Sequence, residues 1–154
     1  MSELTVRRRI LGIDYGRARI GIAVSDELGL LAHPVETIRV ADGSALQRIA
    51  EIIGEKDIER VIIGVPRHMN GSLGESAAEA TAFADKLRKL VSCDVLPWDE
   101  RLSTVAANRM LQERGQKTRD SRAFVDQVAA QIILQGYLDR LQNARERQTQ
   151  RETA

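Results

Sequence analysis

Three groups of carboxylates stand where the neighbouring residues are mainly apolar. Asp14 follows the run ILGI, the pair Asp99 and Glu100 directly follows DVLPW, and Asp126 stands within the pattern FVDQVAA. Singly, each has an ordinary structural explanation, because an Asp can cap a turn and an acid after a strand can cap a helix. Together they favour a shared site, since a buried carboxylate is costly unless it is paired, hydrogen-bonded or bound to a metal.

Carboxylates gathered at one point repel each other unless a hard divalent cation holds them. The carboxyl ends of parallel strands meet at one edge of a sheet, and ligand sites lie in the crevice at that edge. An acid on the first strand, one after the last strand and one on a packing helix can converge there. Mg²⁺ or Mn²⁺ in such a site activates a water molecule and stabilises the leaving oxygen of a phosphodiester. The pattern therefore predicts hydrolysis of a nucleic-acid backbone.

Cationic and turn-forming residues stand close in sequence to these acids or in a glycine-containing loop after a predicted strand, and they could hold a nucleic-acid backbone. Each one taken singly is best explained as solvated surface charge. Their common placement near one edge of the predicted sheet favours phosphate binding. The candidate substrate-binding residues are Arg17, Arg19, Arg67, Asn70, Ser72, Arg101, Lys117 and Arg119.

The elements that must position these residues are those of an α/β domain. Apolar and β-branched runs predict five strands, and apolar residues at helical spacing predict four helices. The strands are expected at 6–15, 20–25, 30–40, 60–66 and 94–98, and the helices at 44–54, 75–91, 103–115 and 123–141. Pro34 lacks a backbone donor, so its strand should lie at an edge or carry a bulge. Three antiparallel strands followed by β-α units predict a five-stranded mixed sheet with helices on both faces.

Length and composition predict a single domain over residues 1–142 and a polar, disordered tail over 143–154. Lys plus Arg is 23 and Asp plus Glu is 22, so the net charge of +1 excludes a strongly basic nucleic-acid coat protein. An aromatic content of 3% argues against a base-stacking platform, and the single Cys93 excludes a disulfide framework. With no apolar stretch long enough to cross a bilayer and no signal-peptide pattern, the expected location is the cytoplasm, with no membrane partner.

Four blocks of the sequence resemble, in order, the signature blocks of the YqgF family, which is also called RuvX. They read LGIDYGRARIGIAVSD, VIIGVPRHMNGSLG, DERLSTVAA and VDQVAAQIILQGYL, and they extend from Leu11 to Leu138. The family includes proteins described as pre-16S rRNA nucleases and as Holliday junction resolvase-like proteins. The resemblance implies a ribonuclease H-like fold and a metal-dependent nuclease site. It also implies a cytoplasmic role in bacterial ribosomal RNA maturation, with pre-rRNA as substrate and ribosomal particles as partners.

The family's motifs also assign roles to the three acids. Asp14 matches the catalytic Asp of the first strand, Glu100 matches the acid of the DER block, and Asp126 matches the helix acid of the final block. The strand VIIGVP, expected beside the first strand, carries no acid, although many ribonuclease H-like nucleases have one there. Neighbouring strands are ~4.8 Å apart, so an acid two strands away must span ~10 Å less its side-chain length, which favours Glu100 over the shorter Asp99.

Two other functions fit the same residues. The same site could resolve four-way DNA junctions, which would normally require a two-fold dimer, and the sequence leaves monomer and homodimer open. Alternatively, the chain could be a non-catalytic RNA-binding assembly factor whose carboxylates are structural. Cleavage of a labelled RNA in Mn²⁺, compared between the wild type and Asp14→Asn, separates the enzymatic functions from the binding factor.

Overall fold

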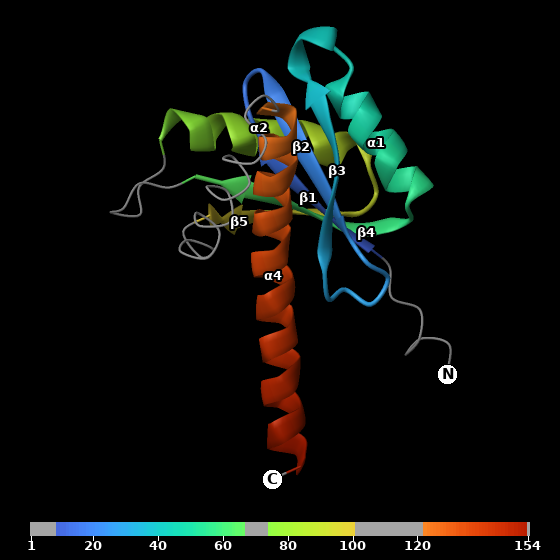
Figure 1. The fold of residues 1–154 in the computed structure, drawn as a ribbon, viewed down its shortest axis with the longest axis vertical. Helices are drawn as coiled ribbons and strands as arrows, with labels where there is room; N and C mark the ends of the chain where they lie inside the picture. Colours follow the sequence, from blue (N-terminus) through green and yellow to red (C-terminus); the bar gives the residue numbers. More distant parts are fainter. Residues whose placement is uncertain (1–8, 67–73, 101–121, 154) are drawn as a thin grey trace.

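The computed structural model describes residues 9–66, 74–100 and 122–153 of the chain (Figure 1). Its strands are β1 (Arg9–Tyr15), β2 (Arg19–Ser25), β3 (Ala32–Arg39), β4 (Ile58–Val65) and β5 (Asp94–Asp99). Its helices are α1 (Ala45–Glu55), α2 (Glu75–Leu90) and α4 (Arg122–Thr153), with a short 3-10 helix, η2 (Val40–Asp42), after β3. The predicted α/β class is confirmed, whereas the helix predicted at 103–115 lies outside the described residues.

The strands form one mixed sheet in the order β3-β2-β1-β4-β5. β2 pairs antiparallel with both β1 and β3, whereas β4 pairs parallel with both β1 and β5. The carboxyl ends of β1, β4 and β5 therefore lie at one edge, which is hereafter called the carboxyl edge. β3 is an edge strand, and its pairing with β2 shifts register between Ile22 and Ala23, where Ala23 pairs with Pro34. The prediction that Pro34 requires an edge or a bulge is confirmed.

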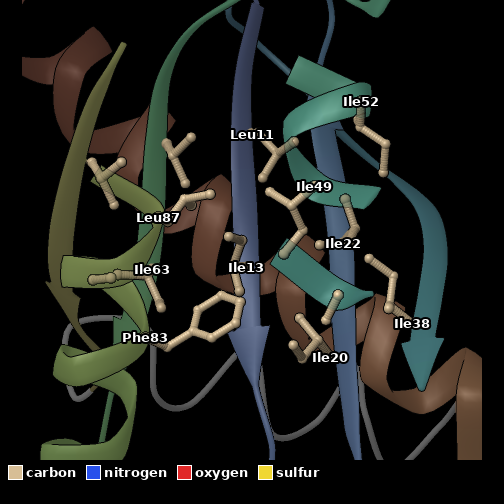
Figure 2. Close-up of a cluster of buried hydrophobic side chains, with 14 of the residues drawn as sticks. Leu11, Ile13, Ile20, Ile22, Ile38, Ile49, Ile52, Ile63, Phe83 and Leu87 are labelled. Atoms are coloured by element: carbon tan, nitrogen blue, oxygen red, sulfur yellow. The ribbon is translucent and has the colours of Figure 1, made fainter. Parts of the chain in front are cut away.

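Helices cover both faces of the sheet (Figure 1). On one face α1 and α2 pack against a cluster of buried side chains that includes Leu11 and Ile13 of β1 (Figure 2). On the other face α4 packs against a second cluster that includes Ile10 of β1. Side chains along a strand point alternately to the two faces, so Gly12 and Asp14 of β1 lie on the face that α4 covers.

Glycines in the sheet allow α4 to approach closely. A Cβ atom placed on Gly21 of β2 would lie 1.9 Å from the carbonyl oxygen of Asp126. A Cβ atom on Gly12 of β1 would lie 2.7 Å from the Cβ of Leu134. Any larger residue at either position would push α4 away from the sheet. Gly21 thereby determines how closely the main chain at Asp126 lies against β2.

The helix α4 is longer than the sequence analysis predicts. It has 32 residues, so the segment 143–154, expected to be a disordered tail, is helical as far as Thr153. Figure 1 shows that the C-terminal part of α4 extends beyond the sheet, and hydrogen bonds within the helix connect its turns there, as from Thr149 to the carbonyl of Arg145 (3.0 Å). Polar composition suggested disorder, but it does not exclude a helix with local side-chain contacts. Within the described ranges, no helix has both the length and the apolar character needed to cross a membrane.

We expect Gly21→Ala to destabilise the protein by about 1–3 kcal/mol, because the added methyl group forces α4 away from β2. Thermal and urea unfolding, followed by circular dichroism, measure this change. Gly54→Ala in α1 is the matched control, because a Cβ there meets nothing within 4 Å and alanine is the better helix former. Equal stabilities of Gly21→Ala and the wild type would contradict this account of how α4 packs.

Candidate functional site

Asp14 lies at the carboxyl end of β1 between glycines on the two neighbouring strands. It pairs with Gly21 of β2, and it directly follows the pair between Ile13 of β1 and Ile63 of β4, which places it beside Gly64. Because glycine has no side chain, the space above both neighbours of Asp14 is open to groups from other elements. Asp14 itself is half-buried.

The two other predicted acids occupy this space. The main chain of Asp126, on α4, lies above Gly21, because the carbonyl oxygen of Asp126 would be 1.9 Å from a Cβ atom placed on Gly21. Glu100 directly follows β5, and its side chain reaches back over β4. A Cβ atom placed on Gly64 of β4 would lie 2.7 Å from the Oε1 atom of Glu100. The structure therefore brings Asp14, Glu100 and Asp126 from three separate elements to the carboxyl edge.

Burial and neighbouring acids change the protonation of Asp14 and Glu100. The pKa of Asp14 rises from 3.8 to about 7, chiefly because burial disfavours the charged carboxylate. The negative charges of Glu100 and Asp126 raise it further. Burial also raises the pKa of Glu100, and the charge of the adjacent Asp99 adds to this shift. Without a cation at the site, Asp14 is therefore partly protonated at neutral pH.

An arginine from β2 holds the carboxylate of Asp126. The Nε of Arg19 donates a hydrogen bond of 2.6 Å to the Oδ2 of Asp126. Arg19 stands two residues before Gly21, so its side chain lies on the same face of the sheet and meets α4. The sequence predicted a substrate-binding role for Arg19, and in the structure its guanidinium group contacts one of the candidate acids.

The chemistry of the three acids fits a hard divalent cation. Carboxylate oxygens are preferred ligands of Mg²⁺ and Mn²⁺, and a bound cation would offset the repulsion that raises the pKa of Asp14. In the part of the chain that the structure describes, no three His, Cys, Asp or Glu side chains are placed so that they could hold a metal ion together. Binding of one cation by Asp14, Glu100 and Asp126 therefore requires their side chains to turn toward one another.

The other predicted substrate contacts fall into two groups. Arg17 turns to α2, where its Nε donates to Glu79 at 2.8 Å and its Nη2 lies 3.1 Å from an oxygen of Glu75. The remaining predictions lie outside the described residues; they are Arg67, Asn70, Ser72, Arg101, Lys117 and Arg119.

Sequence reasoning missed an arginine and two glycines at this edge. Arg39 pairs with Arg19 across β3 and β2, so both side chains lie on the face of α4. Arg39 is exposed and has no ion pair with another described residue. Its position depends on a pairing register that the sequence does not give. For Gly21 and Gly64 there was a signal, because a glycine inside an apolar strand often marks the close approach of another element.

The raised pKa of Asp14 predicts how stability depends on pH. Between about pH 4 and pH 7 the native protein keeps a proton on Asp14 that the unfolded chain loses, so this group lowers the free energy of unfolding as the pH rises. In buffer with EDTA, Asp14→Asn should therefore be more stable than the wild type at about pH 8, by on the order of 4 kcal/mol. The difference should vanish below about pH 4, as measured by urea unfolding over a pH series.

The control for this experiment is Glu146→Gln, in the exposed C-terminal part of α4. This variant loses one carboxylate far from the site, so the pH profile of its stability should follow that of the wild type. A stability difference between Asp14→Asn and the wild type that stays constant across the pH series would contradict the raised pKa.

Known proteins resemble this chain over most of its length. The model of the family RuvX, described as Holliday junction resolvase, matches residues 8–140. A protein of Agathobacter rectalis with the name "Putative pre-16S rRNA nuclease" is 45% identical over 141 residues, which cover 89% of this chain and 99% of the relative. A protein of Bacillus cereus (strain AH187) with the same name is 40% identical over 135 residues, which cover 86% of this chain and 98% of the relative.

Solved structures show the same fold. RuvC of T. thermophilus in complex with Holliday junction substrate has a TM-score of 0.59 at 14% identity, covering 83% of this chain and 91% of that one. A second structure of Thermus thermophilus RuvC has a TM-score of 0.55, also at 14% identity, over 84% of this chain and 94% of that one. The predicted ribonuclease H-like fold is confirmed. On the family match and the identity to these relatives, the chain belongs to the RuvX family.

Proposed function

We propose that this chain is a metal-dependent nuclease that hydrolyses phosphodiester bonds in structured nucleic acid. The observation that carries the proposal is the convergence of Asp14, Glu100 and Asp126 at the carboxyl edge, where burial, together with the charges of the other two acids, raises the pKa of Asp14 to about 7. Structural carboxylates usually have cationic partners, whereas Asp14 and Glu100 have no ion pair with any described residue. The relatives named for nuclease activity support the same function.

The cofactor of this reaction would be Mg²⁺ or Mn²⁺ held by Asp14, Glu100 and Asp126. When bound, the divalent cation supplies an activated water molecule and positive charge for the leaving oxygen of the phosphodiester. The half-buried position of Asp14 keeps bulk water from part of the site, which strengthens electrostatic interactions there. Glu100 and Asp126 approach Asp14 from opposite neighbouring strands, over Gly64 and Gly21.

For the substrate, we propose the precursor of 16S rRNA, with cleavage that matures its 5′ end. The relatives carry this substrate in their names, and they match this chain over nearly their whole length. Ribosomal particles in the cytoplasm would then be the partners of the protein. The description of the matching family favours a second candidate substrate, the four-way DNA junction. Symmetric cleavage of such a junction needs two sites related by a two-fold axis, and hence a homodimer.

The exposed guanidinium group of Arg39 is suited to bind a phosphate of this substrate. Arg17 and Arg19 are engaged with carboxylates, whereas Arg39 is exposed on the same face as Asp126 and has no ion pair with a described residue. A contact of this kind would position the strand without reading its sequence.

Cleavage of a labelled pre-16S RNA fragment in Mn²⁺ tests the proposed function. The wild type should cleave, and Asp14→Asn and Glu100→Gln should each lower the rate by roughly 10²-fold or more, because each removes a ligand of the cation. Glu146→Gln is the control and should cleave at the wild-type rate. A four-way DNA junction, tested in parallel, decides between the two substrates.

Two results would contradict the proposal. Equal cleavage by the wild type and Asp14→Asn would place the activity elsewhere or in a contaminant. RNA binding without cleavage by either protein would instead support the non-catalytic assembly factor.

Arg39→Gln should weaken binding to an RNA duplex, because it removes a phosphate contact. The slope of the logarithm of the binding constant against the logarithm of salt concentration should fall by about one unit. Fluorescence anisotropy in EDTA, over a range of salt concentrations, measures both quantities. Lys89→Gln is the matched control, because it also removes one exposed positive charge. Lys89 lies in the last turn of α2, shortly before β5 begins, and the start of β5 is at the edge of the sheet opposite the carboxyl edge. An unchanged slope for Arg39→Gln would show that this arginine contacts no phosphate.

A further inference from the structure

The ion pair between Arg19 and Asp126 joins the start of β2 to the first turns of α4. Its 2.6 Å hydrogen bond is short, as expected when both groups are charged. The side chains are 34% and 20% exposed, so water screens the pair less than it screens an exposed one. This contact therefore has more influence on the orientation of Asp126 than an exposed salt bridge would have.

The pair engages one of the two carboxylate oxygens of Asp126, which is an acid that the proposed metal ion would need. Asp14 and Glu100 have no ion pair with any described residue, so Asp126 is the candidate acid whose charge is already balanced by a cation. The described acids also do not form a set that could hold a metal ion in their present positions. Both observations have one explanation if the guanidinium group keeps Asp126 turned away from the other two acids.

We infer that Arg19 is an internal counter-ion of Asp126 that competes with the divalent cation for its carboxylate. The inference rests on the proposed function, because it assumes that Asp126 is a metal ligand. On this inference, a cation that binds the carboxylate of Asp126 weakens or replaces the hydrogen bond between its Oδ2 atom and Arg19. Arg19 is thus a positioning residue, which stabilises the metal-free site and lowers its affinity for metal.

The affinity for Mn²⁺ tests the inference without any measurement of cleavage. Isothermal titration calorimetry and the electron paramagnetic resonance signal of free Mn²⁺ both report the Kd. We expect Arg19→Gln to bind Mn²⁺ about fivefold more tightly than the wild type, because the competing cation is gone. A residue that merely orients Asp126 for the metal would give the opposite result, which is weaker binding.

Arg17→Gln is the matched control for Arg19→Gln. Arg17 lies two residues before Arg19, and its substitution removes the same charge, but its partners are Glu79 and Glu75 of α2. Its substitution therefore measures the general effect of removing a positive charge near the site. The inference requires that Arg19→Gln increases the affinity clearly more than Arg17→Gln does.

A second measurement uses the wild type and does not depend on the folding of a variant. Competition is reciprocal, so a bound cation must weaken the ion pair. Titration with diamagnetic Mg²⁺ should move the Nε–Hε resonance of Arg19 and speed its exchange with water, while that of Arg17 stays unchanged. A resonance of Arg19 that does not respond to saturating Mg²⁺ would overturn the inference.

The outcomes separate the failure of the inference from that of the proposed function. If the wild type binds Mn²⁺ and Asp14→Asn does not, but Arg19→Gln has an unchanged or weaker affinity, the inference is wrong and the proposed function stands. If neither the wild type nor Arg19→Gln binds Mn²⁺, the metal-dependent function fails, and the inference fails with it.

Discussion

The close packing of α4 against glycines of the sheet is the constraint on which the candidate site depends. Asp14 would be an isolated acid at the end of β1 without it, because Asp126 reaches the carboxyl edge only where its main chain lies directly over Gly21. Gly64 has the corresponding role on the other side, where it leaves room for the carboxylate of Glu100. Two glycines within buried strands therefore determine whether three acids, distant in sequence, can act together.

This packing has an electrostatic cost that function would explain. Burial and the charges of two neighbouring acids raise the pKa of Asp14 to about 7, so the folded protein holds this carboxylate in an unfavourable environment. Arg19 balances the charge of Asp126 and of neither other acid. Natural proteins tolerate such local costs chiefly at functional sites, where a ligand or cation relieves them.

The sequence predicted the architecture and the three acids, because these depend on local patterns. Apolar runs and helical spacing give the strands and most of the helices, and Pro34 indicates the edge strand. The contacts of the site could not be predicted in this way. Whether Arg17 meets α2 while Arg19 meets Asp126, and whether Arg39 stands beside Arg19, depends on strand register and helix placement. The helical state of the segment after residue 142 was also missed, because polar composition does not distinguish a solvated helix from a coil.

The central claim is that the carboxylates of Asp14, Glu100 and Asp126 together form one binding site for a divalent cation. Crystals grown with Mn²⁺, measured at a wavelength where manganese scatters anomalously, test it most directly. The account predicts an anomalous peak in contact with oxygen atoms of all three carboxylates, at about 2.1 Å, with the guanidinium group of Arg19 displaced from Asp126. No anomalous peak among these residues at saturating Mn²⁺, with Arg19 still bonded to Asp126, would contradict it.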